Sequence, residues 1–524
     1  MQRKRLPIGK QTFNVVRDPK ENYVYIDKTQ FAHKMIEAGG DYYFLARPRR
    51  FGKSLFLDTL SEIFKGNKEL FKGLYIYDKW DWNQQFPVII IDFTGGNYSS
   101  KENLQEMLRV KLKSNMKHLG LDEKECFHEE PGIFLQNIIQ QTYLMYKQKV
   151  VVLIDEYDKP IIDNIGKSDK NMALVARETL RGLYPAIKAS DRYLRFVFMT
   201  GVSKFSKLNL FSGLNNIQDI TLDKNYATIT GYTQIDLEEN FAEYLQGVDL
   251  DTVKTWYNGY NYFGDAVYNP FDILLFLSNN CEFSNYWWET GNPSFLIEKL
   301  KEGNYFLPEL ENIEVGRDTL NAFDVEHIDL VALLWQTGYL TFDKKTTDGG
   351  GVFYKMKVPN LEIQSSLNVL FFEYLTKLNG ERVRFHLNLR KALKETDFEG
   401  IKKELVSLFA AIPYENYVNN TIANFEGYYA SVLFAFLSSI GYEIKTEEST
   451  NRGRIDMTLI GTESIYIIEF KVDMPAEVAL YQIQTKKYYE KYLVQNKEIY
   501  LIGMHFSSKV KNIVGMEWRK LEIH

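Results

Sequence analysis

Cysteine is scarce in this chain: only Cys126 and Cys281 occur among its 524 residues. Neither lies in the spacing of a metal-binding or redox motif, so we expect neither a disulfide framework nor a cysteine zinc site. The seven histidines are scattered and form no zinc-binding pattern. The composition therefore predicts a reduced protein.

Long apolar runs are missing as well. No run approaches the ~20 residues that a transmembrane helix needs. The first residues, MQRKRLPIGKQTF, lack the apolar core of a signal peptide. We therefore expect a cytoplasmic protein with no membrane partner.

Basic residues are not in excess. The net charge is −6, and the region from residue 401 onward is not basic either. No overall positive field attracts the chain to nucleic acid, so any contact with DNA or RNA must be local. Aromatic residues are abundant, with 35 tyrosines and 35 phenylalanines, so large cores are available. The length is too great for one ordinary domain.

Strand and helix patterns alternate over residues 1–235, which is typical of a parallel sheet covered by helices on both faces. One expected strand contains the continuous apolar run VVVLI, as a central parallel strand should. The expected strands are Tyr42–Ala46, Val88–Asp92, Val150–Asp155 and Arg195–Met199.

Two further regions follow. Residues 236–395 have helical stretches after capping residues and short strands near 339–342 and 353–358, which indicates a helical or winged-helix lid or linker. Residues 396–524 form a second α/β pattern. Its expected elements are a helix at 424–439, a strand pair, a helix at 476–492 and a strand at 499–504.

A phosphate-loop motif follows the first expected strand. Residues 47–54 read RPRRFGKS, in the strand–loop–helix context that such a loop requires. In this motif the glycine lets the backbone approach a phosphate, the lysine reaches the β- and γ-phosphates, and the serine binds Mg²⁺. The following helix points its positive end at the anion. The candidate nucleotide ligands are Arg49, Gly52, Lys53, Ser54 and Leu55.

The run VVVLIDE, about a hundred residues later, supplies the acidic part of a nucleotide site. Asp155 would bind Mg²⁺, and Glu156 would polarise the attacking water. Thr200 and Ser203, after the next strand, would sense the γ-phosphate. The alternative is that Lys53 is a surface lysine and Asp155 a turn residue, but both motifs stand at strand ends in the right order.

A second cluster of charged residues lies in GRIDMTLIGTESIYIIEFK, which reads as two strands joined by a tight turn. If the turn centres on Thr462–Glu463, Asp456 lies opposite Glu469, and Lys471 shares their face. Because like charges directly opposite destabilise a strand pair, a divalent cation is the expected compensation. The two strands are Ile455–Ile460 and Ile465–Val472.

These residue types suit phosphodiester hydrolysis. Asp456 and Glu469 can hold Mg²⁺ or Mn²⁺, which neutralises the phosphate and supplies hydroxide at neutral pH. The carbonyl of Phe470 would complete the metal's ligands. Lys471 keeps its proton beside two acids, so it would orient water and stabilise the pentacovalent charge.

Each of these residues also has a structural interpretation. IEFK on a strand, taken alone, is more often a half-exposed edge with an ion pair, and Asp456 could simply end a turn. Arg452 and Arg454 flank the patch. Arg454 falls opposite Lys471 by the same turn arithmetic, so it either contacts phosphate or balances the acids. Three lysines of the following helix could contact a phosphate backbone, but a charged helix face is the default interpretation. They are Lys486, Lys487 and Lys491.

Four segments resemble the bacterial AAA-ATPase-like family over about residues 5–280: YIDKTQF, FLARPRRFGKSLFLDTL, VVVLIDEYDKP and FMTGVSKFSKLNLFSGLNNI. Members also tend to have RPRRFGKS, so Arg47 in place of the motif's first glycine is a family trait. The resemblance implies a P-loop ATPase with an extra strand between the nucleotide strand and the acid strand. It implies ATP with Mg²⁺, and it assigns the family's roles to Lys53, Ser54, Asp155 and Glu156.

The order Asp456…Glu469-x-Lys471 resembles that of the PD-(D/E)xK nucleases. The C-terminal region as a whole resembles the nuclease-like domain found after this ATPase domain, which implies an α/β restriction-endonuclease-like fold. The superfamily's layout adds Glu426, in the helix before the hairpin, as a further metal-directed acid. It also adds Gln482, in the following helix, facing the site. Each of these two is alternatively a solvated helix residue.

The sequence therefore predicts an ATP-binding, ATP-hydrolysing protein fused to a metal-dependent phosphodiesterase that acts on DNA or RNA. Defence or mobile-element biology is the expected setting. The alternative is a nucleotide-dependent switch or remodelling ATPase whose nuclease-like domain only binds a partner or nucleic acid. No arginine finger is evident, so we expect a homo-oligomer to supply one.

Overall fold

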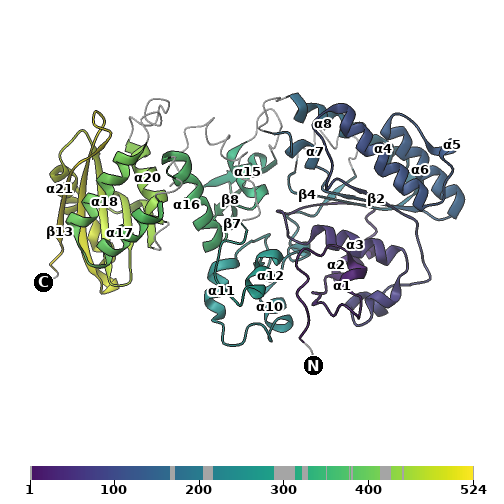
Figure 1. The fold of residues 1–524 in the computed structure, drawn as a ribbon, viewed down its shortest axis with the longest axis horizontal. Helices are drawn as coiled ribbons and strands as arrows, with labels where there is room; N and C mark the ends of the chain where they lie inside the picture. The colour runs from purple at the N-terminus through teal and green to yellow at the C-terminus, as the bar shows by residue number, and fades with distance from the viewer. Residues whose placement is uncertain are drawn as a thin grey trace. The chain divides into compact units, whose positions relative to one another are not determined.

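The computed structural model describes residues 3–165, 171–204, 216–287, 313–321, 329–349, 351–376, 378, 382–412, 426–438 and 442–522. The chain divides into two units (Figure 1). The first comprises Met1–Leu296 with Glu314–Ile363, and the second comprises Ile297–Ile313 with Gln364–His524. The three-part division at residues 235 and 395 stays a prediction. Within the described ranges, none of the helices combines the length and apolar character that crossing a membrane requires.

The first unit is built on a five-stranded parallel sheet with the order β2-β3-β4-β1-β5. Strand β4 therefore separates β1, which precedes the phosphate loop, from the acid strand β3, as the family resemblance implies. Buried apolar side chains dominate β1, β3 and β4, because helices cover both faces of a parallel sheet. The strands are β1 Tyr42–Ala46, β2 Val88–Asp92, β3 Val150–Asp155, β4 Leu194–Gly201 and β5 Gln218–Asp219.

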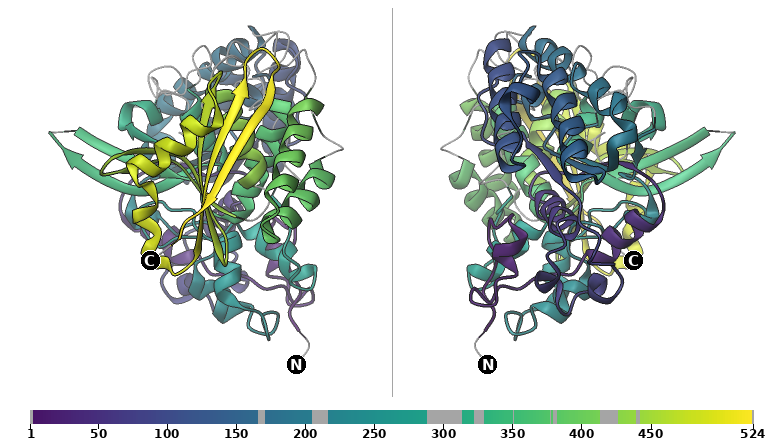
Figure 2. Two further views of the ribbon diagram at one scale, coloured as in Figure 1. Left: turned by 90° about the vertical axis from the view of Figure 1, so that its left-hand side faces the viewer. Right: turned by 90° about the vertical axis from the view of Figure 1, so that its right-hand side faces the viewer.

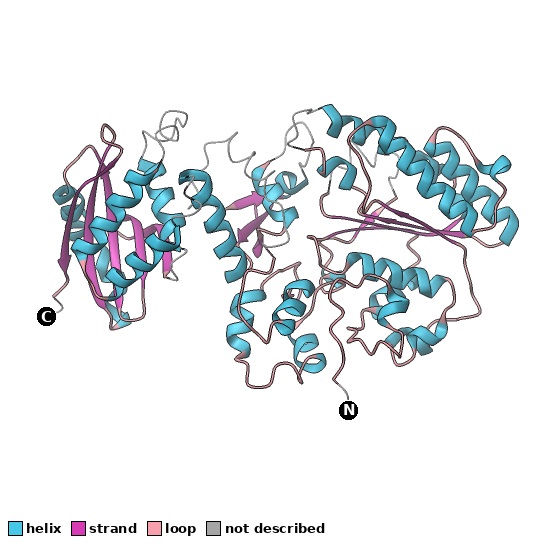
Figure 3. Cartoon of the chain, in the orientation of Figure 1, coloured by secondary structure: helices cyan, strands magenta, loops and turns pink. Residues whose placement is uncertain are grey.

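Helices lie on both sides of this sheet (Figures 1 and 3). One side carries α2 Thr29–Glu37 and α3 Lys53–Phe64, and the other carries α4 Lys101–His118 and α6 Pro131–Tyr146. Helix α3 buries an apolar stripe whose phenylalanines pack on Phe196 and Phe198 of β4. Shorter helices of this part are α1 Phe13–Val16, α5 Glu123–Cys126, α7 Lys159–Ile162, α8 Asn171–Arg181 and α9 Tyr184–Ala189. The 3-10 turns are η1 Lys68–Phe71, η2 Tyr75–Asp78, η3 Asp191–Tyr193 and η4 Lys224–Tyr226.

The rest of the first unit is mainly helical. A second apolar core joins α10, α11 and α12 to residues near the N-terminus. The two strands expected near 339–342 and 353–358 form an antiparallel pair, β7 and β8, and β6 adds a third strand. The elements are α10 Gln234–Asn240, α11 Leu250–Tyr257, α12 Pro270–Ser278, β6 Glu314–Gly316, α14 Arg317–Asn321, α15 Leu330–Thr337, β7 Thr341–Asp348 and β8 Gly351–Lys357.

The second unit contains a mixed sheet with the order β13-β12-β11-β10-β9. Strands β11 and β12 are parallel and the other pairs antiparallel. Figure 2 (left) shows α21 on one face of this sheet and the helices that precede it in the chain on the other. Its elements are α16 Leu361–Thr376, which starts in the first unit, α17 Arg382–Lys394, α18 Phe398–Ala411, α20 Glu426–Ser438, β9 Glu443–Thr450, β10 Gly453–Ile460, β11 Ser464–Val472, α21 Ala476–Lys486, β12 Glu498–Ser507 and β13 Asn512–Lys520.

One expected helix is shorter than predicted. The pattern predicts helix over 476–492, but α21 ends at Lys486. Lys487, at its C-cap, has the left-handed conformation with φ of 51°, which stops the α-helical hydrogen bonding. A 3-10 segment, η8 Tyr488–Gln495, continues the chain. Its Tyr488 and Tyr492 are buried in the same core as Ile483 of α21, which explains the apolar spacing.

Candidate nucleotide and metal sites

The phosphate loop has the predicted strand–loop–helix setting. Strand β1 ends at Ala46, and α3 begins at Lys53. Gly52 forms the N-cap of α3 in the left-handed conformation, with φ of 87°, which favours glycine. Its carbonyl accepts the N–H of Phe56 at 3.0 Å. The N–H groups at the start of an α-helix have no acceptor within the helix, and such groups favour anions.

Arg47, in place of the first glycine of the motif, is a buried structural residue. Its guanidinium donates to the carbonyl oxygens of Ala46 at 2.9 Å, Thr221 at 2.7 Å and Tyr226 at 3.3 Å. It also lies 3.6 Å from the ring centroid of Tyr262. Burial lowers the pKa of Arg47 to about 10, so the side chain is charged at neutral pH. Arg47 therefore joins the start of the loop to residues 221–226.

Lys53 is buried against its own loop. Its Nζ donates to the carbonyl oxygens of Arg47 at 3.0 Å and Pro48 at 2.9 Å. Burial lowers the pKa of Lys53, and the carboxyls of Glu156 and Asp155 oppose that effect. The lysine thus lies between the loop and the acidic end of β3, as the motif predicts.

The end of β3 is held by hydrogen bonds to β4. The hydroxyl of Thr200 donates to Oδ1 of Asp155, and both side chains are buried. The backbone N–H of Glu156 donates to the same hydroxyl at 3.4 Å. Burial raises the pKa of Glu156, while the Lys53 ammonium lowers it. The acid pair is therefore positioned by Thr200.

Ser203 is hydrogen-bonded to Asp158. Its hydroxyl donates to Oδ2 of Asp158 at 2.5 Å, and its N–H donates to the same oxygen at 2.6 Å. Asp158 also accepts the N–H of Val202 at 3.0 Å. These bonds hold the end of β4 against Asp158, and the sensing role of Ser203 stays a prediction. Asp158, three residues after Asp155 in VVVLIDEYDKP, is fully buried, and the motif gives no sign of its bonds to the end of β4.

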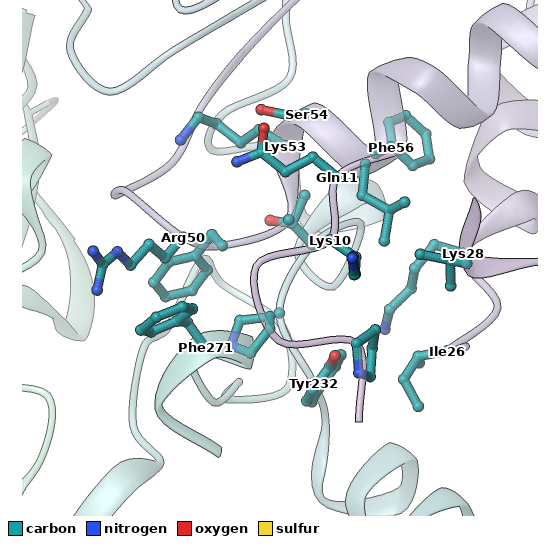
Figure 4. Close-up of a pocket in the computed structure, with 18 of the residues that line it drawn as sticks. Lys10, Gln11, Ile26, Lys28, Arg50, Lys53, Ser54, Phe56, Tyr232 and Phe271 are labelled. Atoms are coloured by element: carbon teal, nitrogen blue, oxygen red, sulfur yellow. The ribbon is translucent and has the colours of Figure 1, made fainter. Parts of the chain in front are cut away.

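A cavity of about 420 Å³ adjoins the phosphate loop (Figure 4). It lies within the first unit, between the N-terminal segment, the loop, α3, residues 229–232 and α12. Among the candidate nucleotide residues, six line it: Arg49, Gly52, Lys53, Ser54, Leu55 and Glu156. Asp155 and Thr200 are not part of the lining. Asp155 is the last residue of β3, and Thr200 of β4 is hydrogen-bonded to it.

The N-terminal segment contributes residues that sequence reasoning did not single out. Lys10 and Gln11 line the cavity, and Figure 4 shows Gln11 beside Lys53 and Ser54. The segment is tied to α3 because the N–H of Phe13 donates to Asp58 Oδ2 at 2.6 Å. No local motif predicts this placement, because about forty residues separate the segment from the loop.

In the second unit, the hairpin has the register that the turn predicts. Met457 pairs with Ile468 and Thr458 with Ile467, so Asp456 and Glu469 are the next pair outward. Oδ2 of Asp456 accepts the N–H of Phe470 at 2.8 Å. Register and this bond bring the two carboxylates together.

Lys471 and Gln482 both approach Glu469. Nζ of Lys471 lies 3.5 Å from Oε1 of Glu469. The side-chain amide of Gln482, on α21, donates to the same oxygen. Glu469 is 1% exposed, and its Oε2 has no hydrogen-bond partner among the described residues. A buried carboxylate oxygen that accepts no hydrogen bond destabilises the folded protein. A cation bound to this oxygen would remove that cost, so the residues present fit a metal ion.

The pKa values of Glu469 and Asp456 agree with a cation at this position. Burial and the neighbouring Asp456 raise the pKa of Glu469 to about 8, although Lys471 acts in the opposite direction. Burial also raises the pKa of Asp456, against the effect of the Phe470 N–H and Lys471. Two adjacent carboxyls that resist ionisation together are typical of sites completed by a divalent cation.

The third predicted acid cannot be placed. Helix α20 begins at Glu426, but the side chain of Glu426 lies outside the described residues. Over the part of the chain that the structure describes, no group of three or more histidines, cysteines, aspartates or glutamates could hold a metal ion. Of the three acids predicted to bind metal in this unit, the structure therefore describes the side chains of two, Asp456 and Glu469.

Basic residues around the hairpin form ion pairs. Arg454 bonds Glu447 at 2.5 Å and Arg452 bonds Glu490 at 3.4 Å, so both arginines balance acids. Lys491 contacts Glu448 at 2.7 Å, and Lys487 contacts Glu490 at 3.9 Å. A residue that the sequence did not reveal is Tyr488 of η8, whose hydroxyl hydrogen-bonds Gln482.

Comparison with known proteins agrees with this architecture. The family described as "Predicted AAA-ATPase" matches residues 7–211, and the PD-(D/E)XK nuclease superfamily matches residues 424–516. An uncharacterized protein in the vnfD 5' region of Azotobacter chroococcum mcd 1 is 44% identical over 518 residues, which cover 98% of this chain and 99% of the relative. No solved structure matches the chain. The chain thus belongs to the family of predicted AAA-ATPases, with a C-terminal domain of the PD-(D/E)XK nuclease superfamily.

Proposed function

We propose that the first unit binds ATP with Mg²⁺ in the cavity at the phosphate loop. The observation that carries this proposal is the convergence of Lys53, Ser54 and Glu156 on one cavity of about 420 Å³. That volume lies within the range of small-molecule sites, ~300–1,000 Å³. The ammonium of Lys53, which bonds two loop carbonyls, would transfer its hydrogen bonds to phosphate oxygens.

Hydrolysis of the bound nucleotide would use the end of β3. Ser54 and Asp155 are the residues that would hold Mg²⁺, which neutralises phosphate charge. Glu156 lines the cavity and would orient and polarise water there. Its raised pKa makes the carboxylate a stronger base. Exposed Arg49 would contact phosphate at the cavity mouth.

Nucleotide binding can be tested by titrating ATP and Mg²⁺ into the full chain. We expect Lys53→Ala to weaken binding at least tenfold, since it removes a charged contact to phosphate worth about 1.5–3 kcal/mol. Lys65→Ala is a matched control, because Lys65 lies at the other end of α3 and pairs with Glu62. Equal affinities for the Lys53 variant and the wild type would contradict the proposal.

We propose that the second unit is a metal-dependent phosphodiesterase that acts on nucleic acid. The observation that carries this proposal is the adjacent pair of half-buried Asp456 and buried Glu469, in which one carboxylate oxygen of Glu469 lacks a donor among the described residues. These two residues would hold Mg²⁺ or Mn²⁺, and such an ion supplies charge neutralisation and a more acidic water. Two carboxylates leave room for phosphate and water as further ligands.

The neighbouring side chains have distinct proposed roles. Lys471 is partly exposed, at 19%, so its ammonium can reach a phosphate while it stays near Glu469. We expect it to stabilise the charge that develops on the phosphate. Gln482 fixes the orientation of Glu469 through its amide. We propose Glu426 as a further carboxylate that contacts the metal, because nucleases of this superfamily often have an acid in the helix before the hairpin.

Metal binding is the direct test of this site. Mn²⁺ titrated into the full chain should bind tightly to the wild type and not to Glu469→Gln. Glu463→Gln is the charge-matched control, since Glu463 lies exposed in the turn of the same hairpin. If Glu469→Gln binds Mn²⁺ as the wild type does, the carboxylate pair is not the metal site.

A second candidate function is non-catalytic: a nucleotide-dependent switch whose nuclease-like domain only binds nucleic acid or a protein. It is favoured by the absence, within the described ranges, of any group of three or more metal-binding residues. It predicts no Mn²⁺ binding at Asp456 and no cleavage under any condition. Both candidate functions are compatible with a role in defence or mobile-element biology and with assembly into a homo-oligomer. These two proposals rest on the family resemblance alone.

A further inference from the structure

One amide side chain faces the nucleotide cavity from outside the two nucleotide motifs. Gln11 lines the cavity and is exposed, so a ligand bound there can reach its amide. Over the part of the chain that the structure describes, no hydrogen bond engages this amide. Gln11 is also the one amide among the described side chains of the lining. Because an amide has an acceptor oxygen and two donor hydrogens, it can bond two groups at once.

The segment that carries Gln11 is fixed on both sides. Before it, the N–H and the carbonyl of Arg5 are bonded to backbone groups of residues 22–24 at 2.8 Å and 3.0 Å. After it, Phe13 is fully buried, and its ring stacks on that of Phe71 with the centroids 4.7 Å apart. The two anchors hold the intervening residues against the cavity.

Gln11 lies at the start of α3. The N–H of Phe13 donates to Oδ2 of Asp58 on that helix at 2.6 Å. Asp58 and Ser54 are four residues apart on the same side of α3, ~6 Å along its axis. Gln11 precedes Phe13 by two residues, ~7 Å of extended chain, which is enough to bring it level with Ser54. Figure 4 shows the Gln11 amide beside Lys53 and Ser54.

This end of the cavity is where the γ-phosphate of a bound nucleotide would lie. In the phosphate-loop motif the lysine reaches the β- and γ-phosphates, and the serine binds Mg²⁺. Glu156 lines the same cavity, and its charge raises the pKa of Lys53, so the two groups are near each other. An ionised carboxylate can only accept hydrogen bonds, whereas the amide of Gln11 can also donate one to a phosphate oxygen.

We propose that Gln11 is a further catalytic residue of ATP hydrolysis, whose carbonyl oxygen accepts a hydrogen bond from the attacking water and whose amide donates to a γ-phosphate oxygen. The water oxygen bonds the γ-phosphorus, the bond from that phosphorus to the bridging oxygen breaks, and ADP leaves with the electron pair. The water proton passes to the Glu156 carboxylate. Orientation of the nucleophile by a side chain is a recurring part of phosphoryl transfer. The inference rests on the proposed nucleotide site and adds a group from the N-terminal segment.

The first test separates catalysis from binding in the full chain. Gln11→Ala should lower kcat for ATP hydrolysis about a hundredfold, since a group that acts on the transition state contributes on that order, and should change KM much less. Gln11→Glu keeps the size and an acceptor oxygen but loses the donor, so it should not restore kcat. Gln148→Ala is the matched control, because Gln148 is exposed in the same unit and does not line the cavity. Unchanged kcat in Gln11→Ala, or full activity in Gln11→Glu, would overturn the inference.

Equilibrium titration of ATP and ADP gives a readout that needs no turnover. Because the contact is to the γ-phosphate, Gln11→Ala should weaken ATP binding about threefold and leave ADP binding unchanged, whereas Lys53→Ala should weaken both. Equal weakening of ATP and ADP in Gln11→Ala would overturn the inference. A wild-type chain that binds ATP without hydrolysing it would overturn the inference alone. Failure of the wild type to bind either nucleotide would overturn the nucleotide site with it.

Discussion

Arg47→Gly would create the phosphate-loop consensus, yet we expect it to destabilise the protein. The first glycine of the motif ordinarily allows a tight turn. Here Arg47 is 1% exposed, and its guanidinium donates hydrogen bonds to the carbonyl oxygens of Ala46, Thr221 and Tyr226. It also covers the ring of Tyr262 at 3.6 Å. The substitution therefore removes donors and leaves a cavity.

The magnitude follows from those contacts. Each buried acceptor left without a donor costs about 1–3 kcal/mol, and the contact with Tyr262 adds about 1–2 kcal/mol. Water entering the vacated space recovers part of this loss. We therefore expect the free energy of unfolding of the first unit to fall by about 3–5 kcal/mol, at the upper end for single substitutions.

Urea unfolding followed by tryptophan fluorescence measures this change, read as a shift of the midpoint at constant slope. Arg49→Gly is the control, because it introduces the same glycine two residues later at an exposed position. A stability loss below about 1 kcal/mol for Arg47→Gly, or equal losses for the two variants, would refute the structural role of Arg47.

Three other predictions concern buried acids. The pKa of Glu469, raised to about 8, means that a cation must displace a proton, so Mn²⁺ affinity should rise about tenfold per pH unit up to pH 8. A pH-independent affinity would contradict this. Burial raises the pKa of Glu362 to about 8 beside Asp272. Between the ordinary pKa of a glutamate and pH 8, Glu362 is therefore protonated in the folded state and ionised in the unfolded chain. Unfolding free energy should therefore fall by about 1.4 kcal/mol per unit as pH rises toward 8, and Glu362→Gln should flatten the profile. Asp158→Asn should cost about 1–3 kcal/mol in the same urea assay, because it weakens the bonds to Ser203.

The parts of the fold that the sequence predicts well are those with local signals. The apolar run VVVLI needs burial on both faces, and β3 lies at the inside of the sheet accordingly. The hairpin register follows from turn length alone, because strand pairing is then determined. The same geometry brings Asp456 and Glu469 together.

Features that depend on distant residues were harder to predict. An arginine is seldom buried, and nothing near Arg47 indicates the carbonyls of Thr221 and Tyr226 that accept its hydrogens. Lys10 and Gln11 reach the cavity only through long-range packing. Strand β9 is polar along its length because it lies at the sheet edge, so its pattern gave little sign of a strand.

The most direct test of the central claim is the rate at which the full chain cleaves labelled DNA and RNA with Mn²⁺ and ATP. We predict cleavage by the wild type and a loss of about a hundredfold or more in Lys471→Ala, since electrostatic stabilisers of this kind contribute on that order. Lys445→Ala, which removes a lysine paired with Glu443 on the same sheet, should cleave normally. Equal cleavage by the wild type and Lys471→Ala, or no cleavage by either, would contradict the account.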